Sequence, residues 1–74
     1  MATSEVAELR RRIELELEAM QHGLNGFAIG TARHEFIRRR MDRVGMYQGE
    51  LAREVGEDTA TGMVFTIYAE KMEA

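Results

Sequence analysis

Apolar residues recur at helical spacing through the middle of the chain. Between residues 31 and 55 they stand three or four positions apart: Ile37, Met41, Val44, Leu51 and Val55. Gln48 is the one polar interruption, and Phe36 and Tyr47 widen the apolar side. Spacings of three and four return a residue to the same face of an α-helix. The pattern therefore predicts one long amphipathic helix over 31–55, against which the other segments pack.

A second apolar stripe precedes the long helix. Its members are Val6, Leu9, Ile13, Leu17, Met20 and Leu24. Ser4 is a suitable cap for the start of this helix and Gly23 a suitable stop, which predicts a helix over about 4–23. Asn25-Gly26 is a turn dipeptide, so the two helices are expected to form an antiparallel hairpin.

The last segment has a contested pattern. Gly56 is expected to end the long helix, and Asp58 or Thr59 can cap a third helix over about 58–72. Its centre, residues 63–68 (MVFTIY), is rich in β-branched and aromatic residues, which favour a strand. One strand has no partner within this chain. We therefore predict a helix, with a strand that pairs across a dimer as the alternative.

Composition supports a small all-α domain. The 74 residues include no proline and only 7% aromatics, and such a chain predicts a single helical domain over 1–74. A domain of this size buries roughly 60% of its unfolded surface, so it commonly needs extra stabilisation. With no cysteine, disulfides and thiolate metal sites are excluded, and oligomerisation becomes the expected source. We predict an antiparallel helical hairpin plus a shorter third helix, assembled into a dimeric helical bundle.

The predicted homodimer interface is the apolar side of the long helix: Phe36, Ile37, Met41, Val44, Tyr47, Leu51 and Val55. Two-fold symmetry would bring its basic half to the acidic half of its partner. The expected intersubunit neighbours are Arg39 and Arg43 on one helix and Glu50 and Glu54 on the other. Gly45 and Gly49 also share a face. They predict either the close approach of another helix or a local kink.

Arginines suggest a second kind of partner. Four of them share one side of the long helix, with Phe36 and Tyr47 between them: Arg33, Arg39, Arg40 and Arg43. Such a band can follow phosphates while aromatic rings stack on bases. The net charge of −3 argues against general nucleic-acid binding. Intersubunit ion pairs or a solvated rim are the alternative interpretation of the band.

A short motif also bears on nucleic acid. Residues 48–56 have the pattern Gln48-x-x-Leu51-Ala52-x-x-Val55-Gly56. This resembles the opening of a repressor-type helix-turn-helix, in which the alanine lets two helices cross closely and the glycine makes the turn. The resemblance implies a recognition helix that reads bases in the major groove. The chain departs from the family at Glu57 and Gly62, where apolar and β-branched residues are usual, and 61–68 contains no arginine or lysine.

Little in the chain points to catalysis. His22 and His34 lie on different segments outside any metal-binding motif, and Ser4 is the only serine. No apolar run approaches the roughly 18 residues of a membrane span. We therefore expect a cytoplasmic protein with no enzymatic activity, cofactor, metal or membrane association. The predicted function is an oligomerisation or protein-interaction module whose partners are a second copy and another protein. A small dimeric DNA-binding regulator is the alternative.

Overall fold

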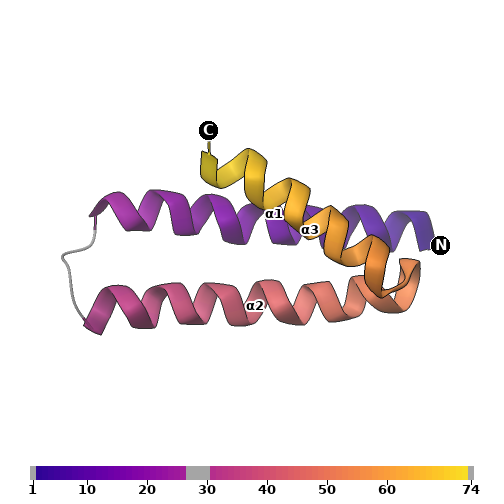
Figure 1. Ribbon diagram of the computed structural model, residues 1–74, viewed down its shortest axis with the longest axis horizontal. Coiled ribbons are helices and arrows are strands. Elements are labelled where there is room, and N and C mark those ends of the chain that lie inside the picture. Colours follow the sequence, from indigo (N-terminus) through magenta and orange to yellow (C-terminus); the bar gives the residue numbers. More distant parts are fainter. Residues whose placement is uncertain (1, 27–30, 74) are drawn as a thin grey trace.

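Three helices make up the fold of this computed structural model, which describes residues 2–26 and 31–73. They are α1 (Ala2–Gly26), α2 (Thr31–Val55) and α3 (Glu57–Glu73). Figure 1 shows α1 and α2 side by side and antiparallel, with α3 crossing α1 obliquely. The predicted all-α hairpin with a shorter third helix is confirmed, and the described residues contain no strand.

The core lies where the three helices meet. Its buried residues are Leu9, Ile13, Leu17, Met20, Val44, Leu51, Ala60 and Ile67. Four of them belong to the predicted stripe of α1, and the two ends of that stripe, Val6 and Leu24, pack partly buried against the core. The stripe of α1 is therefore confirmed. Removing these side chains from water is the main favourable contribution to folding.

The stripe of α2 is only partly as predicted. Val44 and Leu51 are buried, and Ile37 and Val55 pack against them, but Met41 is 40% exposed. Its place in the apolar stripe was therefore predicted wrongly. Phe36 and Tyr47 pack against the core instead, because the face that α2 turns inward is rotated away from Met41.

Gly23 does not end the first helix, because α1 continues to Gly26. A Cβ atom at Gly23 would overlap the ring of Phe36, so the glycine makes room there for an aromatic side chain of α2. The predicted stop was wrong because the glycine serves packing instead of chain reversal. Ser4 lies inside the first turns of α1 and is not its cap. The turn between the hairpin helices, residues 27–30, is outside the described residues.

Gly56 joins α2 to α3 without a loop. Its φ of +92° lies in the left-handed region that favours glycine. Its N–H donates to the carbonyl of Ala52 at 2.8 Å, and its own carbonyl accepts from the N–H of Ala60 at 3.0 Å. Gly56 thus ends one helix and begins the next. The predicted caps were therefore wrong, because Asp58 and Thr59 already lie in the first turn of α3.

Residues 63–68 are helical, which confirms the helix over the strand alternative. Ile67 is buried in the core cluster, so packing overrides the β preference of this segment. The hydroxyl of Thr66 donates to the carbonyl of Gly62 at 3.0 Å, one turn back along the helix. No helix in the described part of the chain is both long and apolar enough to cross a membrane.

Candidate interaction surfaces

The predicted dimer interface lies mostly inside the subunit. Val44 and Leu51 are buried, and four others pack partly buried against the core: Phe36, Ile37, Tyr47 and Val55. Of the seven, Met41 alone is exposed. This side of α2 therefore forms the hydrophobic core with α1 and α3, and dimerisation through it stays a prediction.

Two of the four predicted phosphate-binding arginines turn toward α1. Arg40 Nη1 lies 2.9 Å from Glu16 Oε1, and Arg43 Nη1 lies 3.7 Å from the same oxygen. The guanidinium of Arg40 also stands 5.4 Å from the ring centre of Phe36. The Glu16 side chain is only 14% exposed and that of Arg40 28%. This ion-pair cluster ties the two hairpin helices together and occupies groups that a phosphate would need.

The other two arginines do not join that cluster. Arg39 is exposed and pairs with Glu35 at 3.4 Å on its own helix, while Arg33 is half-buried. The structure therefore divides the predicted arginine band into two arginines that pair with Glu16 of α1 and two that do not. Sequence reasoning missed the role of Glu16. It follows Leu9 by seven residues and Ile13 by three, so a helical wheel places it beside the apolar stripe.

A second ion pair connects α1 with α3. Lys71 Nζ lies 2.9 Å from Glu18 Oε2. The hydrogen bond and charge of Lys71 lower the pKa of Glu18, and Arg11 and His22 add smaller effects in the same direction. The hydrogen bond and charge of Glu18 raise the pKa of Lys71, with smaller contributions from Glu14 and Glu70. Each charge of the pair favours the charged form of the other.

The outward side of α2 is uncovered. We call it the glycine face, and its residues are Arg38, Asp42, Gly45, Gly49 and Arg53, all of them exposed. A Cβ atom at Gly45 or Gly49 would meet nothing within 4 Å. The helix also runs unbroken through both positions. Within the subunit no packing contact requires a glycine at either position.

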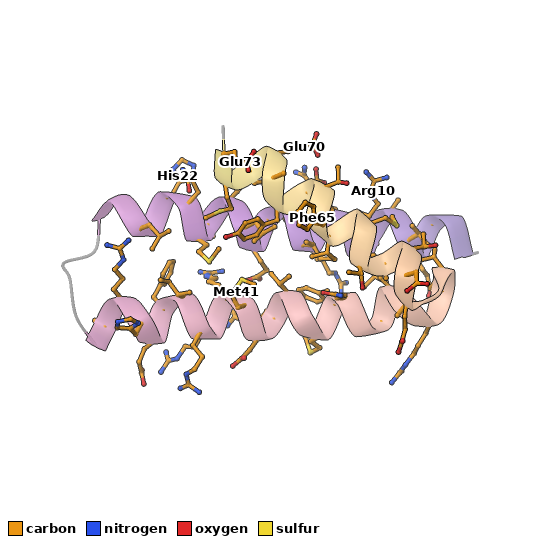
Figure 2. All side chains as sticks on the ribbon, in the orientation of Figure 1. Arg10, His22, Met41, Phe65, Glu70 and Glu73 are labelled. Carbon is orange, nitrogen blue, oxygen red and sulfur yellow. The ribbon has the colours of Figure 1, made fainter. Side chains whose placement is uncertain are left out.

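A shallow groove separates the glycine face from α3. It is lined by Gly45, Gln48, Gly49, Ala52, Glu57 and Thr61. Gln48 Nε2 donates to the Thr61 hydroxyl at 3.2 Å across it. Beyond the groove α3 exposes Phe65, at 74% of its surface, and Tyr68, at 43%. Figure 2 shows the labelled Phe65 on α3 and Met41 on α2.

An open cleft lies where α1 begins and α2 ends. Its lining is Ser4, Glu5, Glu8, Leu9, Arg12, Glu50, Arg53 and Glu54. Arg12 donates to Glu8 at 3.1 Å and stands 5.9 Å from the ring centre of Tyr47. Four carboxylates face two guanidinium groups, so the cleft is mildly acidic. The described residues hold no group of three His, Asp or Glu side chains placed to bind a metal ion.

The segment that resembles a helix-turn-helix has a different connection. A DNA-binding helix-turn-helix joins its helices by a turn of about three or four residues, whereas here only Gly56 separates α2 from α3. Ala52 packs partly buried against the core, as the motif implies, but the second helix exposes Phe65 and Tyr68. No protein-family model, curated protein or solved structure matches this chain.

Proposed function

We propose that this chain is a non-enzymatic, cytoplasmic oligomerisation and protein-interaction module that first pairs with a second copy of itself. The observation that carries the proposal is the distribution of exposed apolar side chains. Met41, Met46, Phe65 and Tyr68 are all exposed on α2 and α3, whereas α1 exposes Leu15. Apolar surface gathered on neighbouring elements is typical of protein interfaces.

The total surface supports self-association. The chain exposes 5208 Å², about 600 Å² more than the roughly 4,600 Å² that a compact monomer of its mass exposes. Its dimensions of 42 × 22 × 19 Å account for the excess. A stable dimer buries about 800 Å² on each subunit. Burying that area would cover about 15% of the surface that the chain exposes.

The DNA-binding alternative has weaker support. Arg40 and Arg43 face Glu16, whose carboxylate offsets part of the positive charge that would attract a phosphate. The only cation on α3 is Lys71, which pairs with Glu18. A protein that contacts several phosphates loses duplex affinity steeply as salt rises. We expect no such salt-dependent binding from this chain.

The test is the mass in solution, measured by size-exclusion chromatography with light scattering over a wide range of concentration. We expect a mass of twice 8.4 kDa that falls toward the monomer only on dilution. A monomer at every concentration would overturn self-association. Duplex binding that weakens with salt and is lost with Arg39→Glu would favour the DNA-binding alternative.

A further inference from the structure

We propose that a second copy docks antiparallel on the glycine face, so that Gly45 and Gly49 of the two α2 helices meet at the crossing. Asp42 of each copy then lies beside Arg53 of the other. This inference rests on the proposed function, since it specifies the surface through which the chain pairs with itself. It places the interface on the side of α2 that faces away from the core.

The glycine face is a continuous strip. Arg38, Asp42, Gly45, Gly49 and Arg53 follow one another at spacings of four, three, four and four residues. Such spacings keep all five on one side of a helix. All five are exposed, on the side of α2 away from the buried Val44 and Leu51. A partner helix can therefore lie along the strip without disturbing the core.

Charges on the strip favour a second copy as the occupant. Asp42 stands three residues before Gly45, and Arg53 stands four residues after Gly49. An antiparallel copy centred between the glycines brings Asp42 of each subunit opposite Arg53 of the other. A parallel copy would bring each charge opposite its own kind, which is unfavourable. The strip is thus complementary to itself in the antiparallel direction only.

Asp42 and Arg53 are available for this pairing. Across the part of the chain that the structure describes, neither has an ion-pair partner within 4.0 Å. By symmetry, each two-fold contact then carries two intersubunit ion pairs.

Apolar side chains border the crossing point. Met41 lies on the α3 side of the strip and Met46, which is 56% exposed, on the other side. Each could cover the backbone of the partner at the glycines, where the missing side chains let two helices approach closely. Each glycine lowers the helix propensity relative to alanine, and no contact within the subunit requires it. A close contact between copies would offset that cost.

Cysteine cross-linking tests the direction and register of the contact, because the chain has no cysteine of its own. Asp42→Cys and Arg53→Cys are made as separate variants and oxidised alone and as an equal mixture. We expect a disulfide dimer in the mixture only. In this antiparallel pair, position 42 of one copy lies opposite position 53 of the other. The two copies of position 42 are therefore offset by 11 residues, or about 16 Å along the helix axis, and so are the two copies of position 53. A disulfide requires Cα atoms within roughly 7 Å of each other. Efficient cross-linking of either variant alone would overturn the antiparallel arrangement.

Substitutions at the crossing point test the surface itself. Gly45→Gln with Gly49→Gln places two bulky polar side chains at the contact, and we expect a monomer with full helix content. Asp42→Arg alone is expected to raise the dissociation constant of the dimer roughly tenfold. The double variant with Arg53→Asp is expected to restore the original value, because the two charges are then exchanged. The matched control is Arg11→Glu, an exposed reversal on α1 that leaves the dimer unchanged.

The outcomes separate this inference from the proposed function. A wild-type chain that is monomeric at every concentration would overturn both. A wild-type dimer that forms no mixed disulfide and keeps its affinity in the glycine and charge variants would overturn the docking face alone. In that case the proposed function stands, and another surface of α2 or α3 carries the contact.

Discussion

The two sides of α2 show how one helix can be built for two purposes. Its inward side carries Val44 and Leu51 into the core and reaches Glu16 of α1 through Arg40. Its outward side carries exposed charges and two glycines, at which an added Cβ atom would meet nothing within 4 Å. Large apolar residues and partly buried ion pairs stabilise the fold, whereas Gly45 and Gly49 lower helix propensity, and no packing contact within the chain requires them.

The difference shows where sequence constraints come from. On the inward side, the residue type at each position fits the contacts that its side chain makes within the same chain. On the outward side Gly45 and Gly49 break the rule that exposed helix positions favour strong helix formers. Local choices that disagree with the fold are expected at sites of function.

Leu51→Ala is expected to have the largest effect. The side chain is fully buried where the three helices meet, so its loss removes apolar burial and leaves a cavity. We expect a loss of about 2–5 kcal/mol in the free energy of unfolding, measured by urea denaturation. Leu15→Ala is the matched control, because Leu15 is exposed on α1 and should change stability by less than about 0.5 kcal/mol. Equal losses for the two leucines would contradict the packing described here.

Gly23→Ala is expected to destabilise the hairpin by about 1–3 kcal/mol. The new methyl group would overlap the ring of Phe36, so the ring or the helix must shift. Gly45→Ala is the opposite case, with open space at the Cβ position, and should raise the stability of the monomer by about 1 kcal/mol. Thermal unfolding at a concentration where the chain is monomeric gives both values. If both substitutions changed the stability in the same direction, the two glycines would not differ in their packing.

The glycines also show which features of the fold could not be predicted from the sequence. Helical periodicity was sufficient for α1, its stripe and α2, whereas α3 was predicted because a single strand has no partner within the chain. Gly23 and Gly56 have the same local signature, but one accommodates Phe36 and the other adopts a φ of +92°. Whether a glycine makes room for a side chain or adopts a positive φ depends on residues distant in sequence. The direction of Arg40 was unpredictable for the same reason, since its partner Glu16 lies 24 positions earlier.

Glu16→Gln is expected to weaken the contact between α1 and α2. It removes the charge that faces Arg40 and Arg43 while keeping the shape of the side chain. Because the carboxylate is mostly shielded from water, we expect a loss of about 1–2 kcal/mol in unfolding free energy. Glu8→Gln is the control, since Glu8 pairs with Arg12 in an exposed i,i+4 contact worth less than about 0.5 kcal/mol. If both variants lose equally little, the cluster holds no structural role, and Arg40 and Arg43 would again be candidates for binding phosphate.

The pair of Glu18 and Lys71 is expected to give the smallest effect, a dependence of stability on pH. The pKa of Glu18 is lowered from 4.5 and that of Lys71 is raised from 10.5. A lowered acidic pKa adds stability above about pH 4.5 that is lost as the pH falls through the folded value. A raised lysine pKa adds stability below about pH 10.5 that is lost as the pH rises through the folded value. The pair therefore stabilises the α1–α3 contact between these limits.

Replacing Lys71 by methionine separates the pair from the rest of the surface charge. Lys71→Met removes the largest influence on the Glu18 carboxyl, so an NMR titration of that carboxyl should show its pKa rising toward 4.5. Arg11→Gln removes a smaller influence and should raise it less. The stability of the Lys71→Met variant should also vary less with pH near these limits. If Arg11→Gln moved the carboxyl as far as Lys71→Met does, the general field of α1 would govern Glu18, and α3 would be held in place by its apolar contacts alone.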